Sequence, residues 1–265
     1  MANPPSNGVD SDEDVEFEDV PFQPAQPQQP STNGSSDLPS EHAGPVSTNI
    51  PWVPSLRVPP QREAPFPSGS NAEVQLRGRL STAIDRINFR QMKAQMGMDT
   101  SNTQPGFSRY TCIQQLADDI EGTADMLWES ATPSIQVEGL ITLAGILERS
   151  LGTYPFDPEP TLTILNKLDY FFIALMQGEH PLSHVRLPGA NPDRPFVTQT
   201  QKVRIRSIAE STRTNLFSMM PQSQDDEDED ENGDGEYDDW EEPEMPPWMM
   251  QATRIYERVL MLLGD

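Results

Sequence analysis

The apolar residues between positions 71 and 220 recur every three or four positions, the spacing that places them on one face of an α-helix. This pattern predicts four helices over residues 71–97, 110–130, 133–151 and 158–177, and a fifth that ends near residue 220. The expected inward faces are Leu76, Leu80, Ile84 and Ile87; Ile113, Leu116, Ile120, Leu127 and Trp128; Leu140, Leu143, Ala144, Leu147 and Leu151; Leu162, Leu165, Leu168, Phe171, Phe172 and Leu175; and Val203, Ile208, Thr212 and Leu216. The sequence therefore predicts an all-α fold, a small bundle of five or six helices.

Helix boundaries are marked by residues that start or stop helices. Thr132-Pro133 and Asp157-Pro158 each read as a cap followed by proline at the first helical position, where the missing N–H costs nothing. Thr198 or Thr200 is the expected cap of the fifth helix, and glycines 97, 152 and 178 are expected ends. The segment DYFFIALM is apolar all round, which predicts a central position for the fourth helix.

A sixth amphipathic helix is predicted after Pro246-Pro247, reaching about Leu263. Its apolar side consists of Trp248, Ala252, Ile255, Val259 and Leu262. Such a stripe needs a partner, so the helix either docks back on the bundle or is presented to another protein through side chains such as Trp248 and Ile255. We favour docking.

The segment 1–71 is rich in Pro, Ser and Gln and has no apolar periodicity, which predicts a disordered arm. Two places in this arm are candidate docking sites for a partner: EFEDVPF, with Phe17, Val20 and Phe22, and the segment around Trp52. The expected organisation is this arm, a helical domain over 72–220, an acidic tract over 221–245 and the C-terminal helix over 246–265.

The formal net charge of −24 is concentrated in two tracts. Residues 10–19 and 225–244 hold 21 of the 42 acidic residues and no basic one, which leaves 21 acidic against 18 basic residues elsewhere. Two helices have basic faces, which are candidate surfaces for an acidic partner or phosphate or are simply solvated. They are formed by Arg79, Arg86 and Arg90 on the first helix and by Lys202, Arg204 and Arg206 on the fifth. The acidic residues of the second helix, including Asp118 and Asp119, are expected to be solvated.

Catalytic motifs are missing from the sequence. It contains no G-x-x-x-x-G-K-[ST], G-x-S-x-G or H-E-x-x-H, and Pro181 separates His180 from His184. The one cysteine, Cys112, cannot form a disulfide within the chain, and we expect it to be a buried or half-buried structural thiol. We therefore expect no enzyme activity, no cofactor and no metal.

The expected location is the nucleus or cytoplasm. A lone cysteine is typical of a reducing compartment. The first residues lack the basic flank and apolar run of a secretion signal, and no stretch approaches the about 18 apolar residues needed to span a bilayer.

Four motifs carry a resemblance to a known family. They are W-x-S-x-T-P-S-I-Q at 128–136, YPFDPEPT at 154–161, K-L-D at 167–169 and K-V-R-I-R-S at 202–207. Over roughly residues 73–220 the chain resembles a poorly characterised fungal family of helical proteins often labelled meiotic recombination proteins. The resemblance implies the helical fold. The label comes from a RecA-like ATPase, which needs a P-loop that is missing here, so the expected role in recombination is accessory.

These observations favour a non-enzymatic adaptor, a subunit or accessory factor of a larger complex with protein partners. The alternative is a nuclear accessory factor linked to DNA or chromatin, with meiotic recombination as one such role, that uses the basic helix faces and the acidic tract. Because the predicted bundle is nearly neutral, nucleic-acid binding is expected to be weak.

Overall fold

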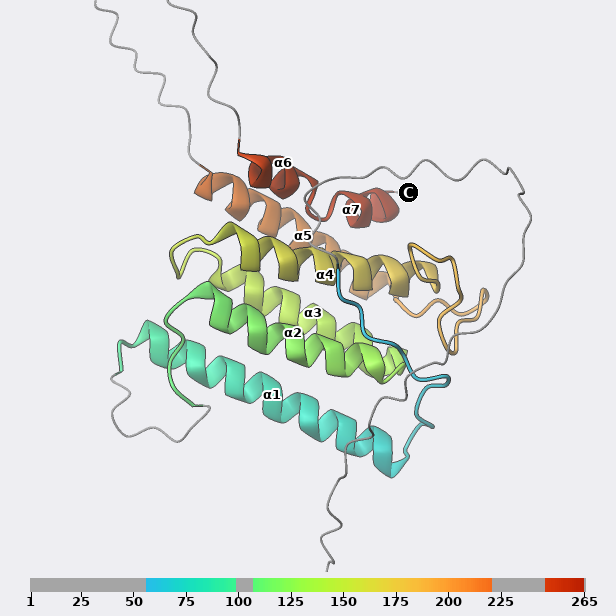
Figure 1. Cartoon of the computed structure of the whole chain (residues 1–265). Helices are drawn as coiled ribbons and strands as arrows, with labels where there is room; N and C mark the ends of the chain where they lie inside the picture. The colour runs from blue at the N-terminus through green and yellow to red at the C-terminus, as the bar shows by residue number, and fades with distance from the viewer. Residues whose placement is uncertain (1–55, 99–106, 221–245, 265) are drawn as a thin grey trace, which may run out of the picture. The chain divides into compact units, whose positions relative to one another are not determined.

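The computed structural model describes residues 56–98, 107–220 and 246–264, and these residues form seven α-helices and no β-strand (Figure 1). The helices are α1 (Asn71–Gln95), α2 (Ile113–Glu129), α3 (Pro133–Ser150), α4 (Pro158–Gln177), α5 (Gln199–Met219), α6 (Pro247–Arg254) and α7 (Glu257–Gly264). The predicted all-α fold is confirmed, and the first five helices begin and end within three residues of the predicted limits.

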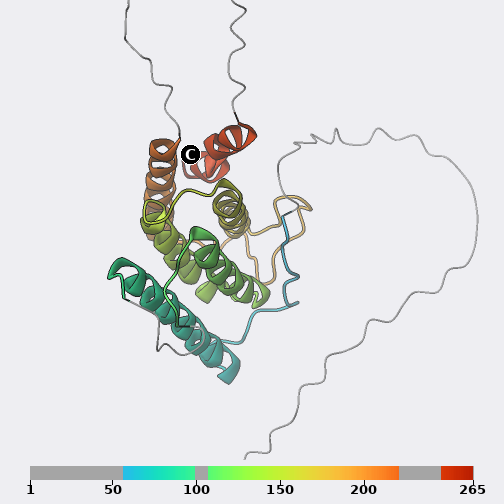
Figure 2. The same ribbon diagram turned by 60° about the vertical axis from the view of Figure 1, so that its left-hand side comes forward.

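Helix α4 occupies the centre, as its apolar sequence predicts. It packs against α2 and α3 on one side and against α6 and α7 on the other (Figure 2). Twelve of the 18 residues of α3 are buried as well, so α3 and α4 supply most of the core. Trp128 of α2 stacks on Phe171 of α4 with their ring centroids 4.4 Å apart, which ties these two helices together.

Short polar contacts fix the junctions between helices. The Thr198 side chain accepts a hydrogen bond from the backbone N–H of Gln201, and the Gln201 side chain accepts one from the N–H of Thr198, a capping box that starts α5. Gly178 ends α4 in the left-handed region at φ 72°. Between α2 and α3, the buried Gln136 amide donates to the carbonyl oxygens of Leu127 and Trp128, both at 3.0 Å.

The predicted inward face of α5 is confirmed at Thr212 and Leu216, which are buried, and Ile208 packs partly against the core. The prediction was wrong for Val203, because it is 61% exposed, and Ile205 and Ala209 are buried in its place. The buried set and the predicted set therefore share two residues. Polar residues surround both sets, so the sequence pattern alone does not distinguish them.

The C-terminal segment forms two helices, so the prediction of one continuous helix was wrong. The chain turns at Ile255, where ψ is 130°, and at Tyr256, where φ is 57°. This turn lets α6 and α7 both pack on α4 and α5, with Ala252, Ile255 and Val259 at most 2% exposed. The expectation that the segment docks on the bundle is confirmed, and residues 246–264 share the core of the predicted 72–220 domain.

The last part of the predicted arm, residues 56–70, is ordered along the bundle. The N–H of Arg62 donates to the carbonyl of Glu129, and the N–H of Phe66 donates to the hydroxyl of Thr132. Thr132 precedes Pro133 as predicted, but its hydroxyl makes no capping bond to α3 and serves this contact instead. Ordered structure therefore begins earlier than residue 72.

A buried lysine joins α4 to α2. Lys167 is 1% exposed, and its Nζ lies 2.7 Å from Glu121 Oε1 and 2.7 Å from Asp125 Oδ1. Burial raises the pKa of Asp125, although the hydrogen bond from Lys167 acts in the opposite direction. Because both carboxylates come from α2, the ammonium group sets the axial position of α4 against that helix.

We predict that Lys167→Met lowers the free energy of unfolding by about 1–2 kcal/mol at neutral pH, because it leaves two adjacent, partly solvated carboxylates without their cation. Urea denaturation measures the change. The triple variant Lys167→Met/Glu121→Gln/Asp125→Asn is the control and should recover most of the loss. Equal destabilisation by both variants would contradict the charge-based explanation.

Candidate interaction surfaces

The basic residues of α1 are largely engaged within the chain. Arg86 and Arg90 both form ion pairs with Asp119 of α2, and the Tyr110 hydroxyl donates to the same carboxylate at 2.6 Å. Burial, reinforced by Asp119, raises the pKa of Tyr110. Of the three basic residues predicted on this face, Arg79 is exposed and forms no ion pair within the described residues. Two of the three basic residues of the candidate face on α1 are therefore engaged within the chain, and Arg79 is exposed.

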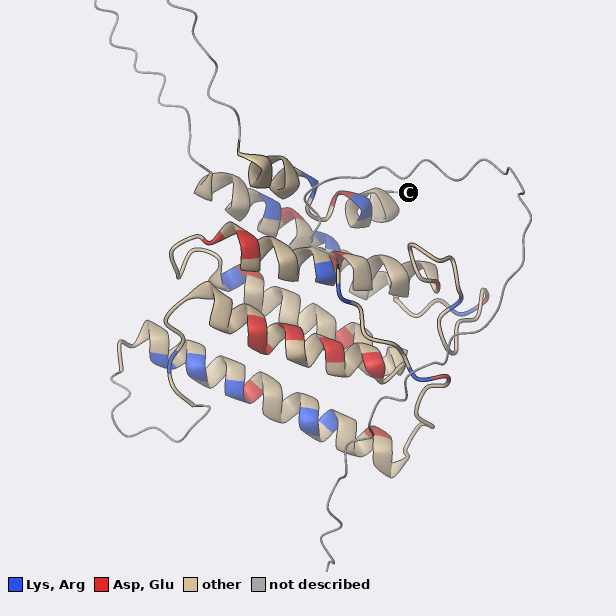
Figure 3. Cartoon of the chain, viewed as in Figure 1, with Lys and Arg blue, Asp and Glu red and all other residues tan. Residues whose placement is uncertain are grey.

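The prediction that the acidic residues of α2 form a solvated face was wrong for most of them, because they form ion pairs with residues of other helices. Figure 3 shows the basic positions of α1 and the acidic positions of α2 along neighbouring helices. Asp119 pairs with α1, and Glu121 and Asp125 pair with Lys167, whereas Asp118 is exposed as predicted. Helical spacing alone could not reveal the partners, because they lie in other helices.

The basic face of α5 is likewise divided among internal contacts. Arg204 pairs with Glu138 of α3 at 2.8 Å, and Lys202 is partly buried. Arg206 donates to the carbonyl oxygen of Leu263, and Arg213 donates to that of Ile255 at 2.7 Å. Two of these cations thus bind the ends of the C-terminal helices, where free carbonyl groups favour positive charge.

We predict that Asp119→Asn loosens α1, because one carboxylate holds two arginines and a tyrosine. The free energy of unfolding should fall by about 1–2 kcal/mol, and amide hydrogen exchange in α1 should accelerate. Asp118→Asn, a change at an exposed neighbour, is the matched control. Equal effects of the two substitutions would contradict this role for Asp119.

Exposed apolar side chains gather at the C-terminal end of α1. Phe89, Met92, Met96, Met98 and Phe107 are 38–61% exposed, and we call them the α1 patch. The rings of Phe89 and Phe107 meet edge to face with centroids 5.9 Å apart, so residues on either side of positions 99–106 contribute to one surface. Clustered exposed apolar residues mark interaction sites, and methionine adapts readily to a partner surface.

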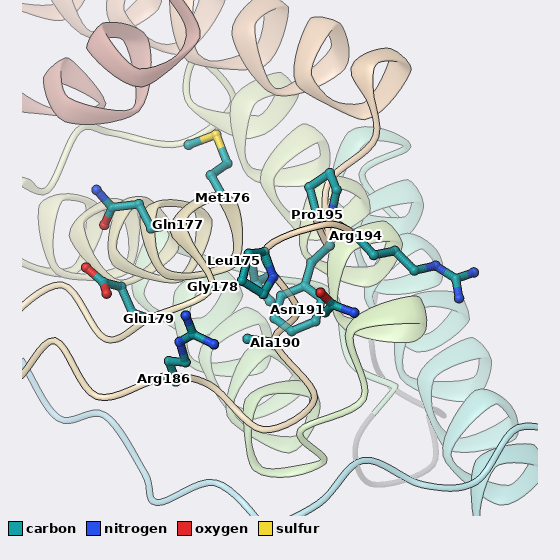
Figure 4. A pocket seen from close by; sticks show the side chains of 12 residues that line it. Leu175, Met176, Gln177, Gly178, Glu179, Arg186, Ala190, Asn191, Arg194 and Pro195 are labelled. Carbon is teal, nitrogen blue, oxygen red and sulfur yellow. The ribbon is translucent and has the colours of Figure 1, made fainter.

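Two depressions adjoin these elements. An open groove of about 720 Å³ runs between α1 and α2, and a Cβ atom added at either Gly78 or Gly122 would meet no other atom within 4 Å. A smaller pocket of about 190 Å³ lies at the end of α4 (Figure 4). Figure 4 shows Glu179 and Arg186 on one side of this pocket, with Arg194 extending away from them.

The two histidines of the described loop and Cys112 do not form one catalytic or metal-binding site. His180 contacts Tyr170, with its Nδ1 3.2 Å from the phenol oxygen, while His184 lies 3.2 Å from Glu179. Within the described ranges, no group of three His, Cys, Asp or Glu residues is arranged to hold a metal. Cys112 is exposed, so the expectation of a buried or half-buried thiol was wrong. It precedes the first turn of α2 and makes no capping bond there.

The remaining predicted contact residues fall into two groups. Phe17, Val20, Phe22 and Trp52 lie outside the described residues, as does the tract 221–245. Trp248 contacts Phe156 with ring centroids 5.3 Å apart, and Ile255 is fully buried. In this structure the partner of the C-terminal apolar stripe is therefore the chain's own bundle.

The described residues define an all-α protein whose notable surfaces are an apolar patch and an open groove. None of the described helices is long and apolar enough to cross a membrane. A family model described as subunit 11 of the general transcription factor TFIIH (TFB6) matches residues 109–264, and the chain belongs to this family. No curated protein and no solved structure matches the chain.

The match corrects the resemblance based on sequence motifs. All four motifs lie within residues 109–264, but the matched family is a family of transcription-factor subunits, and the meiotic recombination label is not supported. The matched segment also differs from the predicted 73–220. It begins after α1 and continues through α6 and α7. The C-terminal helices are thus part of the family unit, and α1 precedes it.

Proposed function

We propose that this protein is a non-enzymatic, nuclear subunit of a TFIIH-type transcription factor complex. The family match over residues 109–264 is the observation that carries the proposal. The architecture supports it, because the described surfaces suit protein contacts better than the binding of a small substrate. The proposal needs neither a cofactor nor a metal.

The α1 patch is the surface that we assign to contact with another subunit. Its apolar side chains are exposed, yet the Lys93 ammonium group lies 4.7 Å from the centre of the Phe89 ring and donates to the Phe107 carbonyl. A patch whose side chains are already positioned loses less conformational freedom on binding than a fully mobile one. The expected partner is an apolar surface of another subunit.

Direct DNA binding is not part of this proposal. Arg86, Arg90 and Arg204 are paired with carboxylates, and Arg206 is bound to a backbone carbonyl. Each phosphate contact would first have to break one of these bonds, which reduces the gain from binding.

The test is to purify the endogenous complex from cells through a tag on this chain. The general transcription factor should be recovered with the chain in stoichiometric amounts. Recovery of the chain as a monomer without those subunits would contradict the proposal.

We predict that Met92→Asp/Met96→Asp reduces recovery of the complex at least tenfold, because it places two charges in an apolar contact. Both positions are exposed, so the fold should remain intact, which circular dichroism can verify. Val74→Asp is the matched control on the same helix, since Val74 is apolar and 61% exposed but lies outside the patch. If the double variant is recovered as well as the control, the α1 patch is not the contact surface.

A further inference from the structure

Two glycines within helices line the open groove between α1 and α2. Gly78 belongs to α1 and Gly122 to α2, and both are exposed. A glycine in a helix interior destabilises the fold by about 0.5–1 kcal/mol relative to alanine. Close packing explains such a residue at Gly139, where an added Cβ atom would lie 2.6 Å from Leu127 Cδ1. At Gly78 and Gly122 the same atom would meet nothing within 4 Å, so packing within the described residues requires neither glycine.

The groove has dimensions that suit a helix. Its α1 wall extends from Gln75 to Arg86, which corresponds to about 16 Å or three helical turns. Ala83 and Met126 line it together with the two glycines, so much of the lining is small or apolar. Because the glycines have no side chains, an incoming helix can approach to the short end of the usual spacing of about 8–10 Å between helix axes.

The two walls of the groove offer opposite charges to an occupant (Figure 3). Arg79 on the α1 wall is exposed and forms no ion pair within the described residues, and the same is true of Asp118 on the α2 wall. The other charged residues of the groove, Arg86 and Asp119, pair with each other. Arg79 precedes Arg86 by seven residues, so the two available charges lie about 10 Å, or two turns, apart along the groove. A complementary helix therefore carries a carboxylate on one flank and a cation on the other.

We propose that the α1–α2 groove binds an amphipathic helix of a partner protein, whose narrow apolar face lies between an acidic and a basic flank. The apolar face contacts Gly78 and Gly122, the carboxylate faces Arg79 and the cation faces Asp118. This surface is separate from the α1 patch, which begins at Phe89. The inference does not rest on the family match, because α1 precedes the matched residues 109–264. Its failure would therefore leave the proposed function unaffected.

Two synthetic helical peptides of about 14 residues, or four turns, test the charge arrangement with the full chain. Both have the same leucine face. The mixed peptide has glutamates on one flank and lysines on the other, and the lysine peptide has lysines on both. In fluorescence anisotropy the unaltered chain should bind the mixed peptide about fivefold more tightly, because only that peptide offers a carboxylate to Arg79.

Arg79→Glu should reverse this preference, because both walls of the groove then carry carboxylates. Arg79 is exposed and unpaired within the described residues, so the fold should remain intact, which circular dichroism verifies. An unchanged preference in Arg79→Glu would overturn the proposal. So would an unaltered chain that binds neither peptide at about 1 mM, the weak limit of specific association.

Gly122→Leu tests whether the groove itself is the binding site. The space around Gly122 accepts a Cβ atom, and leucine favours a helix more than glycine does, so thermal unfolding should show no loss of stability. The leucine side chain occupies the groove and should weaken binding of the mixed peptide about tenfold. Gly78→Leu on the opposite wall should have the same effect. Asn88→Leu is the matched control, since Asn88 is exposed on α1 and lies outside the groove, and equal binding by Gly122→Leu and this control would overturn the proposal.

Discussion

The Lys167 ammonium group lies between Glu121 and Asp125 in the interior of the domain, and much of the structure depends on this contact. A buried cation tolerates little displacement from its anions, because an unpaired charge in the core is far more costly than a shifted methyl group. The contact therefore fixes α4 against α2 at one axial position. The Trp128–Phe171 stack then forms between the same two helices.

Helix α4 is the element that joins the two sides of the domain. Lys167 and Asp169 are two residues apart, which places their side chains on roughly opposite sides of a helix. One contacts the carboxylates of α2, and the other accepts a hydrogen bond from the N–H of Val259 in α7. The first contact joins a cation to two carboxylates, whereas the second leaves Asp169 Oδ1 without a hydrogen-bond partner among the described residues. One side of α4 therefore faces α2 and α3, and the other faces α6 and α7.

The sequence predicts the helices well because their limits depend on local chemistry. Proline at the first position of α3 and α4, glycine after α4 and the Thr198 cap all act within one turn. The break at Tyr256 was not predictable in this way. No glycine or proline marks it, and the left-handed backbone is stabilised by packing of both short helices on α4 and α5. Tertiary contacts decided that conformation.

Candidate interaction residues were predicted less well for a similar reason. A row of arginines on a helix looks the same whether it faces solvent or a carboxylate from another helix. Asp119 and Glu138 are the partners that removed most of the predicted basic surfaces, and both lie in other helices. The α1 patch was missed because Met92 and Met96 continue the apolar pattern of a helix that is buried only in part. Whether an apolar side chain of a helix is buried or exposed depends on how the helices pack together, and the sequence of one helix does not show this.

The two edges of the domain also differ in what holds them. Helix α1 is attached through the buried side chains of Leu76 and Ile87 and, at its surface, through the pairs of Arg86 and Arg90 with Asp119, which remain partly accessible to water. Helices α6 and α7 are attached through apolar burial and through arginines bound to neutral carbonyls. Dissolved ions screen the charged pairs of α1 and scarcely affect the contacts of α6 and α7. Raising the ionic strength is therefore expected to weaken the polar part of the α1 contact more than the contact of α6 and α7, while the buried apolar face of α1 is unaffected.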